Sequence, residues 1–163
     1  MGKGKDGCDS ATPMNDLLGV SLAEAITKAA KKERVSMPEP PTRFGSRGDR
    51  FWENEDGKKH NTDGPAVIKS DGTKEWWING KRHREDGPAV EHNDGSYEWW
   101  VDGRLHCDQG PAVEHASGLR EWFKNGSLHR DDGPAVEWED GDKEWWLDGD
   151  ELSESEWKTR TGR

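Results

Sequence analysis

The chain has 163 residues, with 29% hydrophobic and 36% charged residues and a net charge of −10. This length allows one ordinary domain or one short repeat array and excludes two full hydrophobic cores. Phe, Ile, Leu and Val number only 21, which alone is typical of a disordered chain. Ten tryptophans argue instead for a folded body.

Several protein classes are not expected from the sequence. No apolar run approaches the about 18 residues that a membrane-spanning helix needs. The first ten residues, MGKGKDGCDS, contain no apolar stretch of the kind found in a secretory signal peptide. Cys8 and Cys107 are too few for a disulfide framework and suit a reducing compartment.

Charge is distributed unevenly along the chain. Residues 1–48 hold eight Lys and Arg against six Asp and Glu, whereas residues 49–163 hold 16 against 28. The second part therefore carries a net charge of −12. Because nucleic-acid binding depends on cations that neutralise phosphates, we expect no nucleic acid as a partner of this acidic body.

An internal repeat of 23 residues dominates the body. Four blocks align without a gap, and a partial copy at 51–63 precedes them. The four blocks are GPAVIKSDGTKEWWINGKRHRED (64–86), GPAVEHNDGSYEWWVDGRLHCDQ (87–109), GPAVEHASGLREWFKNGSLHRDD (110–132) and GPAVEWEDGDKEWWLDGDELSES (133–155). Such a period predicts a quasi-one-dimensional array in which each unit packs on its neighbours.

Turn residues indicate that each block is a β unit. One series of Asp-Gly or Ser-Gly pairs begins with Asp71-Gly72, and a second series begins eight residues later with Asn79-Gly80. Both series suit type I′ hairpin turns, in which both central residues have positive φ. With aromatic and β-branched segments between the turns, the sequence predicts a meander of about two main strands per block.

These blocks resemble the MORN-like (MORN variant) repeats of the WWxNGxLHRxDGPA type that are common in bacteriophage and large-virus proteins. Residues 76–89 and 99–112 carry that string almost intact. The resemblance implies a repetitive antiparallel β-hairpin meander or solenoid of about 4.5 repeats. For function it implies interaction rather than catalysis. We expect an all-β array at 49–155 and a polar C-terminal tail at 156–163.

Residues 1–48 have a different composition and are predicted to form an extended arm. The stretch Ser21 to Glu24 is a capping box, and apolar residues follow it at helical spacing. These features predict a short helix at about 21–34, which ends before the prolines of residues 37–41. The side chains expected to bind a partner are Leu17, Leu18, Leu22, Ile26 and Ala30.

Two columns of aromatic residues repeat through the blocks. Because successive strand residues point to opposite faces, one column is expected in the core and the other outside it. The first column, Trp76, Trp99, Trp122 and Trp145, shares its face with Ile78, Val101 and Leu147 and is the expected core ladder. The second is the candidate surface aromatic column, Trp77, Trp100, Phe123 and Trp146. It would either cover the second side of a small core or contact a protein or glycan.

No cofactor or metal site is predicted. His60, His83, His106 and His129 recur at one repeat position, but neighbouring copies would lie about 10 Å apart, too far to share a metal ion. We expect these histidines to bond turn carbonyls. No calcium loop, phosphate-binding loop or nucleophile arrangement occurs, so the sequence predicts a protein that is not an enzyme.

The leading interpretation is a Trp-rich, acidic, non-enzymatic structural or interaction module. Its viral resemblance suggests a phage virion-associated protein (decoration, adaptor or tail-associated), anchored through the arm and found in the virion or host cytoplasm. Its partners would be proteins in a larger assembly, with a homo-oligomer as another possibility and no membrane. The alternatives are a glycan-binding module that uses the second aromatic column, and an acidic host-directed inhibitor protein.

Overall fold

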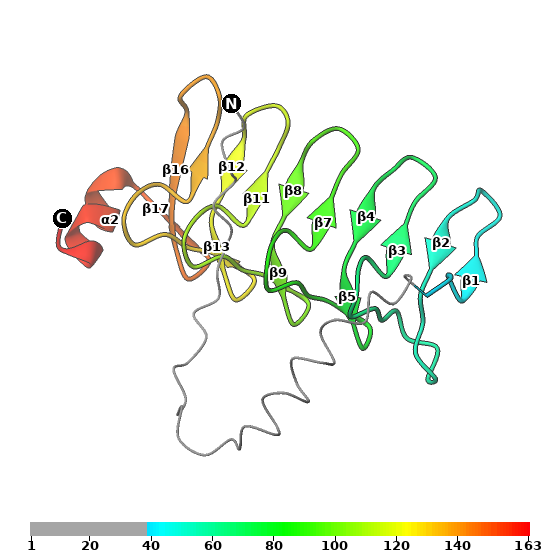
Figure 1. Ribbon diagram of the computed structural model, residues 1–163. Coiled ribbons are helices and arrows are strands. Elements are labelled where there is room, and N and C mark those ends of the chain that lie inside the picture. The colour runs from blue at the N-terminus through cyan, green and yellow to red at the C-terminus, as the bar shows by residue number, and fades with distance from the viewer. Residues whose placement is uncertain (1–38) are drawn as a thin grey trace, which may run out of the picture. The chain divides into compact units, whose positions relative to one another are not determined.

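A computed structural model describes residues 39–163 as an array of antiparallel β-hairpins with one C-terminal helix (Figure 1). The structure confirms the all-β class and the repeated hairpin character that the sequence predicts. Residues 41–163 all belong to one compact unit. The expected arm helix at about 21–34 and the five arm residues assigned to partner binding lie outside the described residues.

Each complete repeat forms two hairpins rather than one. The first hairpins join edge to edge into an 11-stranded sheet in the order β1-β2-β3-β4-β7-β8-β11-β12-β15-β16-β17. Most of these strands contain two residues. In chain order they are β1 (Arg43–Phe44), β2 (Arg50–Phe51), β3 (Val67–Ile68), β4 (Lys74–Glu75), β7 (Val90–Glu91), β8 (Tyr97–Glu98), β11 (Val113–Glu114), β12 (Arg120–Glu121), β15 (Val136–Glu137), β16 (Lys143–Leu147) and β17 (Asp150–Leu152).

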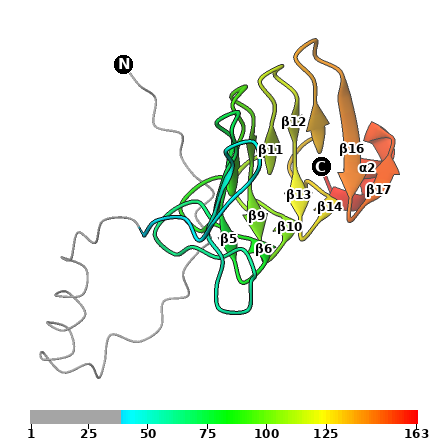
Figure 2. The same cartoon turned by 90° about the vertical axis from the view of Figure 1, so that its right-hand side faces the viewer.

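The second hairpins form a parallel row beside the sheet, as Figures 1 and 2 both show. Their strands are β5 (Trp77–Ile78) with β6 (Lys81–Arg82), β9 (Trp100–Val101) with β10 (Arg104–Leu105), and β13 (Phe123–Lys124) with β14 (Ser127–Leu128). Backbone hydrogen bonds link one second hairpin to the next, as from Gly103 N to Arg82 O at 2.9 Å. In the last repeat, β16 is long enough to belong to both rows.

The two series of turns have different geometries. In the second series both central residues have positive φ, as in Asn79 (49°) and Gly80 (82°), so the predicted type I′ turns are confirmed there. In the first series only the glycine does, for example Gly72 at 95°. The type I′ prediction is wrong for this series, because Asp71 instead accepts the N–H of Thr73 (2.8 Å) in a local turn that needs one positive-φ residue.

The buried core comes from the Gly-Pro-Ala-Val segment of each repeat. The alanines are fully buried and the valines are at most 7% exposed. These core residues are Ala66, Val67, Ala89, Val90, Ala112, Val113, Ala135 and Val136. Of the first aromatic column, the expected core ladder, only Trp99 is buried. The reason is that the Trp-Trp pair lies where the chain passes from the first hairpin to the second, at the boundary of the two rows.

The C-terminal residues form helix α2 (Glu154–Thr161), which the sequence analysis did not predict. Ser153 and Glu156 make a capping box at its start, a signal that was present in the sequence. Trp157 of α2 is 3% exposed, lies 4.6 Å from the ring of Trp145 and donates its Nε1–H to Arg130 O (2.9 Å). The helix therefore covers the fourth complete repeat.

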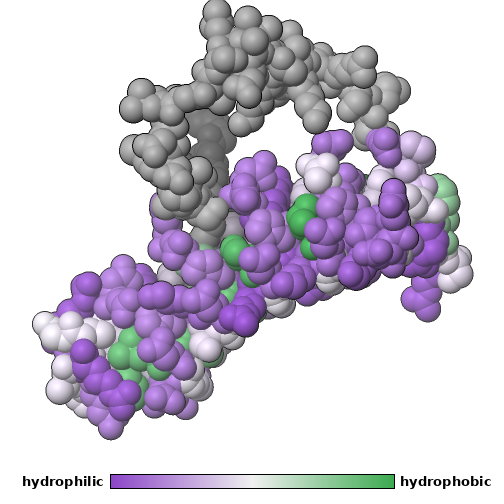
Figure 3. Space-filling model, turned by 90° about the horizontal axis from the view of Figure 1, so that it is seen from below, coloured by the Kyte–Doolittle hydropathy of each residue, from purple (hydrophilic) through white to green (hydrophobic). Residues whose placement is uncertain are grey.

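The surface between these elements is mainly polar. Figure 3 shows a largely hydrophilic face with hydrophobic side chains in small separate areas. Within residues 39–163, no helix has the length and apolar character needed to cross a bilayer.

We predict that Trp157→Ala destabilises the array by about 3–5 kcal/mol, the usual cost of deleting a buried aromatic side chain. The unfolding free energy from urea denaturation measures this loss. Lys158→Ala is the control, because its ion pair with Glu154 (2.7 Å) is exposed and contributes about 0.5 kcal/mol or less. Equal losses in both variants would show that α2 does not stabilise the last repeat.

Candidate functional site

The second aromatic column is tied to a column of glutamates. Trp77 Nε1–H donates to Glu75 Oε2 at 2.9 Å, and the equivalent bond from Trp100 to Glu98 is 2.7 Å. The pattern recurs in the last repeat between Trp146 and Glu144 (3.0 Å). In the last repeat both residues lie in β16, where residues two apart in a strand share a face. Polar edges of these rings are thus already bonded within the array.

Cations cover faces of the same rings. Lys59 Nζ lies 4.3 Å from the centre of the Trp77 ring. Arg82 lies 5.2 Å from Trp77 and 5.0 Å from Trp100, so one guanidinium serves the rings of two successive repeats. The structure places the four members of the candidate surface column in half-buried positions. Their contacts within the array leave less ring face for stacking on a sugar.

Glu75 is the buried charge of this network, with 2% of the residue exposed. Burial opposes its ionisation, but hydrogen bonds from Lys69 (2.8 Å) and Trp77, together with the charges of Arg82 and Lys69, outweigh that effect. The pKa of Glu75 is therefore below its ordinary value. A carboxylate held in this way stabilises the fold only while it is ionised.

A column of histidines joins each repeat to the next. The backbone N–H of Asn125 donates to Nδ1 of His106, 19 residues before it in sequence, at 3.2 Å. This bond occurs four times along the chain, once in each period of the repeat. The donor and acceptor pairs are Asn79 and His60 (3.1 Å), Asp102 and His83 (3.2 Å), Asn125 and His106 (3.2 Å), and Asp148 and His129 (3.0 Å).

This bond requires Nδ1 of each histidine to be unprotonated, because the nitrogen acts as an acceptor. The prediction that the histidines bond turn carbonyls is wrong. They bond turn N–H groups of the following repeat, at residues such as Asn125 that have positive φ (53°). These histidines therefore connect repeats.

Arginines cover the first aromatic column in the first and third complete repeats. The Arg84 guanidinium lies 4.0 Å from the Trp76 ring centre and bonds Asp86 (2.8 Å), Pro88 O (3.2 Å) and Glu91 (2.9 Å). The third complete repeat reproduces the set, with 3.9 Å between Arg130 and the Trp122 ring. In the last repeat, Trp157 takes the place of the arginine.

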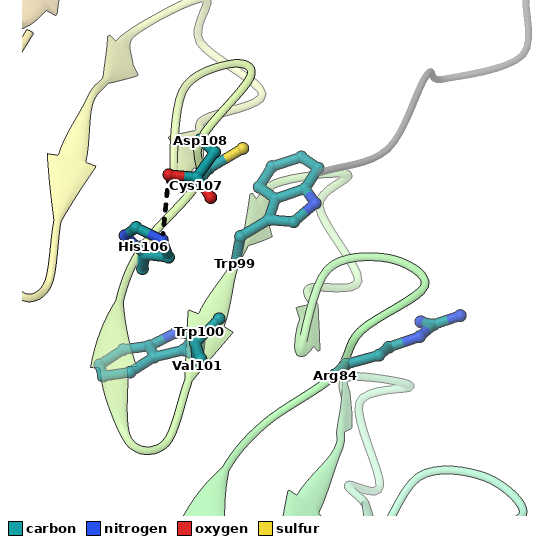
Figure 4. A pocket seen from close by; sticks show the side chains of 7 residues that line it. All are labelled: Arg84, Trp99, Trp100, Val101, His106, Cys107 and Asp108. Atoms are coloured by element: carbon teal, nitrogen blue, oxygen red, sulfur yellow. Dashed lines mark ion pairs between the residues drawn. The ribbon is translucent and has the colours of Figure 1, made fainter. Parts of the chain in front are cut away.

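The second complete repeat lacks this arginine, because Cys107 stands at the position. Figure 4 shows the small hollow around it, lined by Arg84, Trp99, Trp100, Val101, His106, Cys107 and Asp108. The Nε1 atom of Trp99 is buried there without a hydrogen-bond partner. Cys107 is disulfide-bonded, and no free thiol is found in residues 39–163. The other cysteine, Cys8, lies outside the described residues.

Searches of protein-family models and of curated proteins find no match to this chain. Across the described part of the chain, no group of three or more His, Cys, Asp or Glu residues could hold a metal ion. The repeated polar side chains described above bond to one another or to turns, and they form junctions within and between repeats.

We predict that His106→Ala destabilises the array by about 0.5–1.5 kcal/mol, the net value of one hydrogen bond. The same change should speed hydrogen exchange at the Asn125 amide. His115→Ala is the matched control, since His115 lies outside this column and its ring is 3.5 Å from a carboxylate oxygen of Glu121 in its own repeat. If both variants lose equal stability and Asn125 exchange is unchanged, these histidines do not couple repeats.

We also predict a pH-dependent difference between the wild-type protein and Glu75→Gln. Because the pKa of Glu75 is lowered in the folded state, its contribution to stability is complete above its ordinary value of about 4.5 and is lost as the pH falls further. Urea unfolding between pH 3 and pH 7 should therefore show a gap that closes in acid. A constant gap would contradict the role assigned to this carboxylate.

Proposed function

We propose that this chain is a non-enzymatic interaction module whose repeat array is a rigid scaffold. The observation that carries the proposal is the repeated junction of His106 with Asn125 and its equivalents. Side chains of the types that carry chemistry in other proteins, namely histidines, carboxylates and tryptophans, hold the repeats together in this array. An array of this kind offers an extended surface, because successive repeats lie side by side in the order of the chain.

The finer proposal is an anchored component of a virus particle, with MORN-like repeats. It is supported by the resemblance of the repeat string to bacteriophage and large-virus proteins, and by the different composition of residues 1–48. An apolar stripe such as Leu22 and Ile26 in that segment suits docking to a protein partner. In this proposal the segment anchors the chain and the acidic array is displayed.

The anchoring role predicts that the double variant Leu22→Asp with Ile26→Asp no longer joins the assembly. Two negative charges would then replace apolar side chains on the docking stripe, and burying those charges against the partner is unfavourable. The measurement is co-sedimentation of full-length protein with purified particles in a density gradient. Tryptophan fluorescence reports that the array and helix α2, which together contain all the tryptophans, remain folded.

The matched control is Ala23→Asp with Thr27→Asp, which adds the same charge at the same spacing beside the stripe. Particles should retain this control and lose the first variant. Retention of both variants would contradict an anchor at Leu22 and Ile26, and absence of the wild-type protein from particles would contradict the virion proposal.

A further inference from the structure

The two ends of the 11-stranded sheet are closed differently. At the C-terminal end, α2 packs on β16 and β17, and Trp157 is buried there. At the other end, strand β1 pairs with β2 on one side, and no described strand pairs with its other side (Figure 1). An unpaired sheet edge of this kind is a template for pairing with another strand.

The geometry of β1 turns backbone groups toward the open side. The N–H of Gly45 donates to Asp49 O at 2.9 Å, and Phe44 pairs with Arg50. In an antiparallel pair this places the N–H and C=O of Phe44 on the side away from β2. Most interior strands of the sheet are also two residues long, so β1 offers an edge as long as the edges that already join repeats.

The side chains of β1 favour contact as well. Phe44 is 66% exposed and is the one exposed large hydrophobic residue in the described chain. A charged residue on an edge strand can oppose pairing with another chain, but the Arg43 side chain contacts residues of its own chain. Its Nε lies 3.2 Å from Glu53 Oε1, and its guanidinium lies 4.1 Å from the centre of the Phe51 ring.

Charge selects the partner and the orientation. Residues 41–63 hold five Lys and Arg against five Asp and Glu, whereas residues 133–155 hold one against nine. Joining two copies through β1 brings the neutral ends together and keeps the acidic ends apart, beyond the about 8–10 Å over which charges interact in physiological salt. Pairing through the acidic ends would bring like charges into contact.

We propose that two copies of this chain associate through β1, in an antiparallel pair centred on Phe44. This arrangement is a twofold symmetric interface, in which Phe44 faces the partner's Phe44. Each Arg43 then lies opposite the partner's Gly45 rather than opposite another arginine. The inference rests on the open sheet edge and does not depend on the proposed function.

Analytical ultracentrifugation of the full-length protein tests the proposal. We expect a concentration-dependent shift from 18.4 kDa toward twice that mass, and monomer only for Phe44→Asp. Gln109→Asp adds the same charge at an exposed position of the second complete repeat, where Asp86 and Asp132 stand in the first and third repeats, and should dimerise normally. Circular dichroism checks that both variants are folded.

Hydrogen exchange on the wild-type protein tests the interface without a mutation. The Phe44 amide should become more protected as concentration rises, while the Gly45 amide, already bonded to Asp49, changes little. A monomer at all concentrations up to about 1 mM would overturn the proposal. A dimer that survives Phe44→Asp, or a Phe44 amide whose protection is independent of concentration, would also overturn it and assign the edge to another occupant, such as residues 1–38.

Discussion

Two-residue strands are too short to hold a sheet together by themselves, and the rest of this structure depends on that constraint. A strand pair of this length contributes few backbone hydrogen bonds, and isolated hairpins are marginal in water. The array therefore gains its stability where one repeat meets the next. Ala66, Val67 and their equivalents supply the apolar part of each junction, with fully or nearly fully buried side chains. Their small size lets neighbouring hairpins approach closely.

Polar side chains supply the remainder. The histidine column bonds the next turn, the glutamate column bonds the indoles, and arginines such as Arg84 combine a ring contact with several hydrogen bonds. Such networks are favourable when every member is satisfied and costly when one member is removed. This explains how a chain with only 29% hydrophobic residues forms an ordered array. It also explains why the repeated polar residues serve to stabilise the fold.

Departures from the repeat mark the places where the array differs from a uniform solenoid. Cys107 replaces an arginine beside Trp99, and Ser153 replaces one beside Trp145, where the indole of Trp157 covers the ring instead. Phe123 replaces a tryptophan and has no N–H to donate to the carboxylate two residues before it. The two ends of the 11-stranded sheet also differ from each other, because α2 covers one end while β1 is an open edge at the other end of the described sheet. In a repeat protein, such exceptions are where individual function can be placed.

The repeat, its period, the β class and the second series of turns were predictable from the residues, because they depend on local chemistry. Asn79-Gly80, for example, can adopt its backbone conformation wherever it occurs. A local sequence signal for helix α2 was also present, in the capping box of Ser153 and Glu156. The assembled fold was needed to show that Ala and Val form the core and that the histidines accept N–H groups from the next repeat. It also shows that arginines cover rings of the first aromatic column, and that cations and carboxylates contact the second. Those outcomes depend on which residues of neighbouring repeats meet. His106 and Asn125, which are 19 residues apart in sequence, form their hydrogen bond only after the hairpins have stacked.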